Sequence, residues 1–500
     1  MTTLARASLL SCALFASAGL LVGGACNDED HANHEAHDSG PIETPDLTTP
    51  PVEVDMADPV QNANPMLVTV TPALGPTLGG VTITLKGSDF TPGARVSFGG
   101  TEASDVKVVS ATEITALLPA KPGAWGKVPV KVTLGNGRSS TLTDGFRYYA
   151  SRLEFQNPAS TALGMKPETL GPESMILVDL NGDKKDDLVA ALGGANQIAV
   201  ALGKGDGTFN EVKQIAAGAQ PTSVRAADLN ADGKPDLVLT SPFVGKVNVL
   251  LGKGDGTFDM SKDSAAGSRP MAVVSADFTG DMKEDLAVAN FDAGQVTLLV
   301  GKGDGTFEAT SKTTAVGSRP LALSTADLNG DKKADLLVAN FGDKLSILLG
   351  KGDGTFDAKA QDAGAQPFGV TTADVNGDGK LDVLVANSGS STVSVLVGKG
   401  DGTFTAKDPA PVGAAPNTVA SSDFNGDGYA DLVTSDYDAR TLTLLLGKGD
   451  GTFTAGTTLR GTGDEPYSVT ARDLDADGRP DLAAVSRKDG TVRIWLNKAF

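Results

Sequence analysis

The chain contains very little cysteine or histidine, and what it has lies near the N-terminus. Its two cysteines are Cys12 and Cys26, and its three histidines are His31, His34 and His37. The long remainder therefore has no disulfide, no Ser-His-Asp or Cys-His catalytic arrangement, and no zinc site built from cysteine and histidine.

Basic charge is scarce as well. The 62 acidic residues outnumber the 42 lysines and arginines, which leaves a formal charge of −20. Because phosphate backbones are bound by basic faces, we expect no nucleic acid partner. The acidity indicates either a solvated acidic surface or carboxylates that bind cations, and the repeated loops described below favour cation binding.

Long apolar runs are limited to one, from Leu9 to Val22, and its 14 residues are too few to span a bilayer. Arg6 precedes the run and small residues follow it, so we predict that residues 1–25 are an export signal. The stretch Gly23-Gly24-Ala25-Cys26 resembles the end of a bacterial lipoprotein signal, although Gly23 stands where leucine is usual.

The lipoprotein resemblance implies a lipid on Cys26 and an extracytoplasmic place in the bacterial envelope, as an outer-membrane lipoprotein or at the cell surface. Any contact with a membrane then depends on that lipid, and cleavage without a lipid is the alternative. Residues 26–65 are rich in acids, proline and threonine, so we predict a disordered tether. Its histidines indicate either weak binding of Zn²⁺ or Ni²⁺ or only a solvated tail.

Residues 66–149 differ in character. Short alternating runs rich in β-branched residues, such as Val81 to Leu85, predict strands separated by turns, and a segment of this length predicts a small β-sandwich. Pro72 to Gly80, Gly87 to Phe90 and Phe98 to Gly100 together resemble the IPT/TIG family of immunoglobulin-like domains. The resemblance implies a spacer or an interaction module.

Residues 150–500 are dominated by an internal repeat. Seven acidic loops begin at aspartates spaced 49, 49, 50, 47, 49 and 50 residues apart, namely Asp179, Asp228, Asp277, Asp327, Asp374, Asp423 and Asp473. Each loop lies among short apolar runs that show no helical period, and six units end in a Gly-Asp-Gly-Thr-Phe turn and a last strand. Four strands in each of seven units predict a seven-bladed β-propeller. The expected fold is therefore all-β, with the propeller preceded by the immunoglobulin-like β-sandwich.

The seventh unit is incomplete, because the chain ends shortly after the run Ile494 to Asn497. A strand-like piece, Arg152 to Phe155, precedes the first unit. An open ring would leave exposed sheet edges, so we expect this piece to complete the last sheet.

Each acidic loop places oxygen-bearing side chains at its first, third, fifth and ninth positions. Ca²⁺ takes six to eight oxygen ligands, and the seventh position would add a backbone carbonyl. The alternative is a set of tight Asp/Asn turns without ions. The predicted metal ligands are Asp179, Asn181, Asp183, Asp187, Asp228, Asn230, Asp232, Asp236, Asp277, Thr279, Asp281, Asp285, Asp327, Asn329, Asp331, Asp335, Asp374, Asn376, Asp378, Asp382, Asp423, Asn425, Asp427, Asp431, Asp473, Asp475, Asp477 and Asp481.

These loops resemble the FG-GAP/VCBS repeats of integrin α-chain propellers and their bacterial relatives. The resemblance implies one Ca²⁺ in a hairpin loop of each blade, and up to seven ions in all. Lys184, Met282 and Lys332 replace the turn-forming glycine at the sixth position of three loops, and Thr279 is a weaker ligand in the third loop. We expect the third loop to bind its ion most weakly.

The sequence says less about a ligand. Phe243, Phe291, Phe341 and Tyr437 stand at or next to one matched position of their units, where they form either a binding ring or caps between blades. We find no unrepeated cluster of catalytic residues. We therefore expect a calcium-binding module, not an enzyme, that mediates adhesion to a protein or a surface polysaccharide. A lyase-like polysaccharide-active enzyme and a purely structural envelope component are the alternatives.

Overall fold

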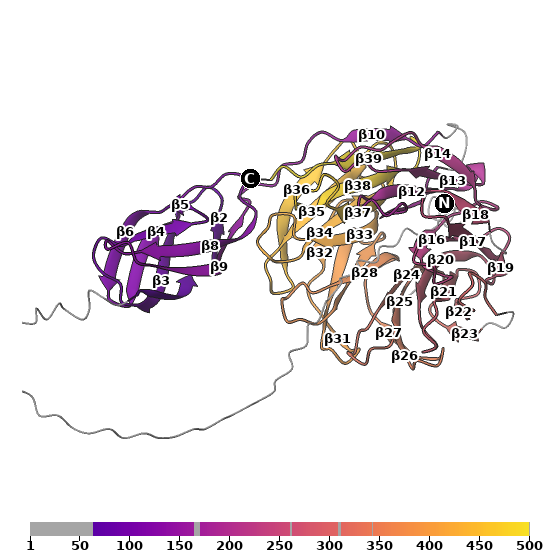
Figure 1. The fold of residues 1–500 in the computed structure, drawn as a ribbon. Helices are drawn as coiled ribbons and strands as arrows, with labels where there is room; N and C mark the ends of the chain where they lie inside the picture. Colours follow the sequence, from indigo (N-terminus) through magenta and orange to yellow (C-terminus); the bar gives the residue numbers. More distant parts are fainter. Residues whose placement is uncertain (1–63, 165–170, 261–262, 309–311, 343, 500) are drawn as a thin grey trace, which may run out of the picture.

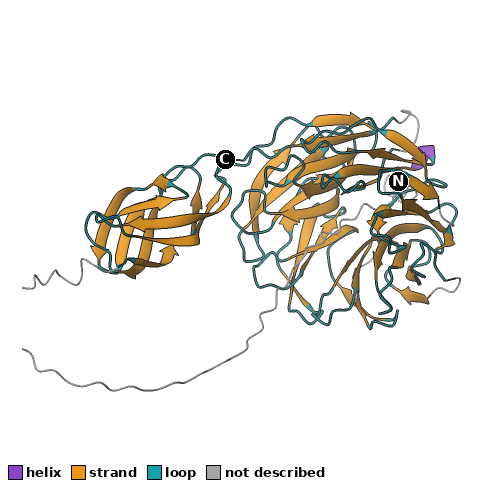
Figure 2. Cartoon of the chain, in the orientation of Figure 1, coloured by secondary structure: helices purple, strands orange, loops and turns teal. Residues whose placement is uncertain are grey.

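The computed structural model describes residues 64–164, 171–260, 263–308, 312–342 and 344–499, which form two β-rich regions (Figure 1). The expected export signal, Cys26 and nearly all of the expected tether lie outside these ranges. Within the ranges, one short 3₁₀ helix, η3 (Gly193–Ala195), stands among strands (Figure 2). None of the helices in the described part has the length and apolar character needed to cross a bilayer.

The first region is a small β-sandwich, as predicted for residues 66–149. Its two sheets have the strand orders β1-β3-β7-β6 and β2-β9-β8-β4-β5. Alternate side chains along the strands point inward, so Ile83 and Phe98 are fully buried whereas Val68 is 52 % exposed. The strands are β1 (Met66–Thr71), β2 (Leu74–Pro76), β3 (Thr82–Ser88), β4 (Arg95–Phe98), β5 (Thr101–Glu102), β6 (Ser104–Ser110), β7 (Glu113–Leu117), β8 (Gly126–Thr133) and β9 (Ser139–Tyr149).

The second region consists of seven antiparallel sheets arranged as the blades of a propeller (Figure 1). Blades one to three comprise β11 (Ser174–Val178), β12 (Asp187–Leu192), β13 (Gln197–Ala201) and β14 (Lys213–Ala216); β15 (Val224–Ala227), β16 (Asp236–Ser241), β17 (Lys246–Gly252), β18 (Phe258–Met260) and β19 (Ser264–Ala265); and β20 (Pro270–Ala276), β21 (Asp285–Asn290), β22 (Gln295–Leu299) and β23 (Lys312–Ala315). Blades four and five comprise β24 (Pro320–Ala326), β25 (Asp335–Asn340), β26 (Leu345–Gly350) and β27 (Phe356–Gln361); and β28 (Pro367–Ala373), β29 (Asp382–Asn387), β30 (Thr392–Gly398), β31 (Phe404–Ala406) and β32 (Ala410–Pro411). Blades six and seven comprise β33 (Pro416–Ser422), β34 (Asp431–Asp436), β35 (Thr441–Gly447) and β36 (Phe453–Leu459); and β37 (Pro466–Arg472), β38 (Asp481–Ser486) and β39 (Thr491–Trp495).

The propeller core lies between the blades. The second strand of every blade is buried along its whole length, as in β25, because neighbouring sheets cover both of its faces. The outer strand β27 is mostly exposed by contrast. This explains why the second strands appear in the sequence as continuous apolar runs and not as alternating ones. The innermost strands contact their neighbours, and β37 of the last blade contacts β11 of the first.

The ring is closed by the segment before the first blade, but not by the piece that the sequence favoured. Strand β10 (Ala159–Ala162) pairs antiparallel with β39 and supplies the missing fourth strand of blade seven. Arg152 to Phe155 only begins this pairing, with an isolated bridge from Phe155 to Asn497. The expectation of closure is therefore confirmed, while its location at Arg152 to Phe155 was wrong. Ala159 to Ala162 has almost no apolar signal, because the strand lies on the outer edge of the sheet.

Neighbouring blades are also joined through the Gly-Asp-Gly-Thr-Phe turns. In four of the six turns the second glycine donates its backbone N–H to the carbonyl of the second loop residue in the preceding blade. Examples are Gly354 to Phe278 at 2.8 Å and Gly207 to Leu474 at 3.0 Å, the latter joining blade one to blade seven. Gly207 has a φ of +77°, and a Cβ there would lie 2.6 Å from the Leu496 side chain, so only glycine fits.

Candidate metal centre

The fifth loop shows how each acidic loop is held. Asp374 occupies the first position, and it accepts hydrogen bonds from the backbone N–H groups of Asp378 (Oδ1, 3.2 Å) and Gly379 (Oδ2, 2.8 Å). Asn376 Oδ1 accepts from Asp378 N–H at 3.0 Å, and Asp378 Oδ1 accepts from Lys380 N–H at 2.9 Å. The loop thus wraps around its own first carboxylate.

This arrangement recurs around the ring. In all seven loops the sixth-position N–H donates to the first aspartate at 2.7–2.8 Å. In all seven the seventh-position N–H also donates to the fifth-position carboxylate at 2.8–3.1 Å. These bonds occupy one oxygen of the fifth-position carboxylate, and in five loops its other oxygen lies 3.0–3.9 Å from the Lys or Arg side chain at the seventh position, which an ion would have to displace.

The ninth-position aspartates occupy a different environment from the other predicted ligands. Each begins the second strand of its blade and is fully buried, as for Asp335. In every blade Oδ2 accepts from the second-position N–H at 2.8–3.0 Å. Oδ1 accepts from an N–H at or just beyond the end of the third strand, at 2.7–2.8 Å. The ninth carboxylate therefore fastens its loop to the blade, whether or not it also binds an ion, and the spacing pattern alone did not indicate this role.

The backbone accommodates the departures from glycine at the sixth position. Lys184, Met282 and Lys332 adopt φ values of +63° to +64° and keep the same hydrogen bond to the first aspartate. A left-handed conformation costs a non-glycine residue about 1–2 kcal/mol, so these loops are strained but not distorted. The fourth position has the same requirement, which the sequence analysis missed. It is glycine in five loops, while Ala231 and Ala476 take positive φ values in the other two.

Electrostatics favour a cation at these loops. Burial raises the pKa of the ninth-position carboxyl group in all seven blades, and nearby loop carboxylates add to the effect. The pKa rises to about 8 at Asp431 and to about 6 at Asp481. Burial likewise raises the pKa of Asp423. A divalent cation would stabilise the ionised carboxylates and reverse these shifts.

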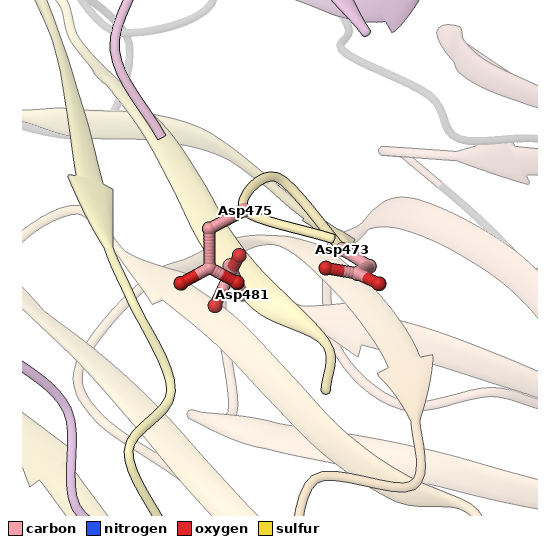
Figure 3. Close-up of side chains that lie close together, drawn as sticks. All are labelled: Asp473, Asp475 and Asp481. Atoms are coloured by element: carbon pink, nitrogen blue, oxygen red, sulfur yellow. The ribbon is translucent and has the colours of Figure 1, made fainter. Parts of the chain in front are cut away.

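The seventh loop brings its carboxylates closest together (Figure 3). Ligand atoms of Asp473, Asp475 and Asp481 all lie within 4.8 Å of one another. Asp475 Oδ1 is buried without a hydrogen-bond partner, as expected of an oxygen that belongs to an ion. The oxygen-rich donor set suits a hard cation such as Ca²⁺ and does not suit a soft metal. The residues therefore fit the ion that the sequence predicts.

The same loop already contacts positive charge from the chain itself. Lys498 Nζ lies 2.5 Å from Asp475 Oδ2 and 3.4 Å from Asp477 Oδ2. The Arg479 guanidinium donates to Asp477 Oδ2 at 3.0 Å. An ion at the seventh loop must therefore compete with an ammonium group that the repeat pattern did not reveal.

Two of the aromatic residues at the matched positions, Phe341 and Tyr437, pack onto buried rings of neighbouring blades, whereas Phe243 is 58 % exposed. Phe341 lies edge-to-face on Phe368, Phe368 on Tyr467, and Tyr467 on Tyr437, with ring centroids 6.0–6.3 Å apart. Phe368 and Tyr467 are almost fully buried. The Arg487 guanidinium lies 5.5 Å from the Tyr467 ring centre. The packing alternative fits Phe341 and Tyr437 and does not fit the exposed Phe243.

The blades and their loops define a seven-bladed β-propeller with an acidic hairpin loop in every blade. The chain belongs to the FG-GAP-like repeat family, whose model matches residues 179–239, 228–288, 277–338, 327–385, 374–434 and 423–484. An IPT/TIG domain model matches residues 65–148, so we call the sandwich the TIG domain. The resemblances to FG-GAP repeats and to the IPT/TIG family are thereby confirmed.

Several solved structures are similar in fold. BBS1N, from its crystal structure in complex with ARL6DN, is 13 % identical over 69 % of this chain and 97 % of that chain, with a TM-score of 0.47. An auxiliary nutrient binding protein from Bacteroides thetaiotaomicron is 13 % identical over 87 % of this chain and 98 % of that chain, with a TM-score of 0.37. A catalytically inactive variant of virginiamycin B lyase from Staphylococcus aureus is 14 % identical over 68 % of this chain and 99 % of that chain, with a TM-score of 0.47. None of the curated proteins matches the chain.

Proposed function

We propose that this protein is an exported calcium-binding propeller that serves as a binding or adhesion module for a protein or a surface polysaccharide. One observation carries the calcium part of this proposal. All seven loops arrange the first-position and fifth-position carboxylates by the same backbone hydrogen bonds, although their sixth residues differ. A set of unrelated tight turns would not need this uniformity.

In this proposal the first, third, fifth and ninth side chains and the seventh backbone carbonyl of each loop hold one Ca²⁺. The ion supplies positive charge that offsets the clustered carboxylates. The loop residues orient the oxygens, and the ninth aspartate transmits the constraint to the buried second strand. These sites lie within single hairpins, which supports a structural role for the ions and a non-enzymatic role for the protein.

The cellular setting is part of the proposal. An export signal at residues 1–25 and a lipid on Cys26 would hold the propeller outside the cytoplasm, in the bacterial envelope or at the cell surface. The TIG domain would then act as a spacer between the anchor and the propeller. A lyase-like enzyme and a structural envelope component stay as the alternatives.

Removing calcium should lower the melting temperature of the protein markedly. A single site at 100 times its Kd stabilises a fold by about 2.7 kcal/mol, and several sites act together. We expect the midpoint in millimolar Ca²⁺ to lie about 10 °C or more above that in EDTA. Mg²⁺ should give a smaller rise, because it demands octahedral geometry. Equal midpoints in Ca²⁺ and EDTA, with no heat of Ca²⁺ binding in calorimetry, would refute the calcium sites.

A binding screen separates the candidate functions. Retention of a glycan or an envelope protein in Ca²⁺ but not in EDTA supports the adhesion module. A calcium-dependent melting temperature without any retained ligand favours the structural component. Turnover of a polysaccharide, measured as new reducing or unsaturated ends, favours the enzyme.

Replacing Lys498 should improve the seventh site. Lys498→Met removes the ammonium beside Asp475 and keeps most of the side-chain volume. The Lys498 ammonium would no longer repel the doubly charged ion, so we expect the affinity of one Ca²⁺ site to rise about tenfold or more. Isothermal titration calorimetry measures this change. Lys488→Met is the control, because Lys488 contacts Asp464 outside the loops. Identical ion counts and affinities in the wild type and Lys498→Met would contradict the competition.

A further inference from the structure

The sixth acidic loop differs from the other six because the TIG domain lies against it. Arg147, in β9 of the TIG domain, directs its guanidinium Nη1 to Asp423 Oδ2 and to the Gly426 carbonyl, at 3.4 Å in each case. Ala150, just beyond β9, donates its backbone N–H to the Asn425 carbonyl at 2.6 Å. Three residues at the start of the loop therefore receive contacts from the TIG side.

The fit at this contact is close. A Cβ at Gly426 would lie 3.1 Å from the Trp125 ring, and a Cβ at Gly428 would lie 3.2 Å from the Arg147 guanidinium carbon. Asn425 is only 6 % exposed, whereas the third-position asparagines of the other loops are half-buried. The glycines of the loop thus leave room for TIG side chains as well as for the turn.

The hydrogen bonds of the loop itself are altered at the same place. In the other six loops the fifth-position N–H donates to Oδ1 of the first aspartate. Asp427 N–H donates instead to Asn425 Oδ1 alone, while the Asn425 side-chain amide donates to Asp427 Oδ2 at 3.0 Å. Asp423, the first-position residue, is the one that the arginine contacts.

We propose that Ca²⁺ and Arg147 compete for Asp423, so that an ion at the sixth loop loosens the TIG domain from the propeller. This inference rests on the calcium sites proposed above, and it assigns to one of them a control of domain arrangement. Ions at the other loops would stabilise the ring. An ion at the sixth loop would change how firmly the TIG domain is held against the propeller.

The charges set the direction of the effect. Arg147 Nη1 lies 3.4 Å from Asp423 Oδ2, and Ca²⁺ takes oxygens at about 2.4 Å, so an ion on either oxygen of Asp423 would lie no more than about 8 Å from Nη1. At separations of about 6–8 Å the repulsion between a dication and Arg147 weakens ion binding about six- to tenfold even at the dielectric constant of water. By linkage, the ion weakens the docking of the TIG domain by the same factor.

The test measures ion binding and domain separation in one protein. The mature chain with Cys26→Ser carries two dyes, one at Ser110→Cys in β6 and one at Lys213→Cys in β14, both exposed positions. Energy transfer between the dyes should fall as Ca²⁺ is added.

In calorimetry, Arg147→Met should raise the affinity of one ion about six- to tenfold and leave the others unchanged. Arg95→Met, an exposed arginine of β4, is the matched control and should change neither result.

A pair of loop variants assigns the effect. Asp427→Ala in the sixth loop should abolish the calcium-dependent change in energy transfer, while Asp378→Ala in the fifth loop should preserve it. Energy transfer that stays constant or rises while calorimetry shows ions binding would overturn this inference and leave the calcium sites standing. Equal affinities in the wild type and Arg147→Met would overturn it as well. An absence of ion binding in every variant would instead overturn the proposed function.

Discussion

Asp335→Ala should destabilise the propeller strongly even in EDTA, where no ion can contribute. The Asp335 carboxylate is fully buried and accepts hydrogen bonds from Leu328 N–H at 2.8 Å and Gly350 N–H at 2.7 Å. Truncation leaves both donors buried without a partner, at a cost of about 1–3 kcal/mol each. We expect a loss of about 2–6 kcal/mol in the free energy of unfolding, measured by denaturant titration.

The matched control is Asp331→Asn in the same loop. Asp331 is exposed and uses one oxygen to accept from Lys333 N–H, and an amide oxygen can accept this bond as well. In EDTA this variant should be as stable as the wild type, whereas in Ca²⁺ it should lose the stabilisation that one ion provides. If Asp335→Ala matches Asp331→Asn in EDTA, the ninth aspartate is only an ion ligand and its hydrogen bonds contribute nothing measurable.

Removing the closing strand should have the other large effect. A chain that begins at residue 150 keeps β10, and one that begins at residue 164 lacks it, while both lack the TIG domain. Without β10 the ring loses the pairing with β39 and the fully buried Leu163, and an unpaired edge is exposed in blade seven. We expect the shorter chain to melt at a clearly lower temperature and to aggregate, as measured by calorimetry and light scattering.

A point substitution in the full chain tests the closure by β10 without removing any other part of the protein. Leu163→Ala in the full chain should cost on the order of 2–5 kcal/mol, as for other leucines removed from a core. Leu153→Ala is the control, because Leu153 is only half-buried and precedes the strand. Unchanged melting of both the shorter chain and Leu163→Ala would show that closure by β10 does not hold the ring together.

The repeat made most of the fold predictable. Each of the seven units carries the same acidic loop and apolar runs, and six share the Gly-Asp-Gly-Thr-Phe turn, so the number of blades and the register of the loops followed from spacing alone. The closing strand was misplaced because Ala159 to Ala162 is an edge strand with little buried surface, whereas Arg152 to Phe155 has the apolar pattern of a strand. Whether a segment becomes an edge strand depends on the strand it pairs with, here β39, which the local sequence of the segment does not show.

The sequence predicted which residues form the acidic loops, but not which of them bind the blade and which face solvent. Spacing identified Asp335 and Asp331 alike, yet Asp335 fastens a strand and Asp331 faces solvent, because only Asp335 has a partner outside the loop, Gly350, 15 residues away. Lys498 and Arg147 were missed for the same reason. They are 23 and 276 residues from the aspartates they contact, so no local motif contains both members of either pair.

The joints between blades have a consequence for how such a chain can evolve. In four of the six turns the second glycine donates back to the preceding loop, and in blade seven, which has no such turn, the Asn497 side chain donates to the Phe424 carbonyl at 2.9 Å instead. The strand pair that closes the ring, β10 and β39, lies at the two ends of the propeller segment. Duplication or loss of one whole internal repeat would leave only kinds of joint that the ring already contains. The number of blades is then limited by the range of angles at which neighbouring blades can pack around the central axis. It is not limited by a strand pairing that occurs in one internal blade alone.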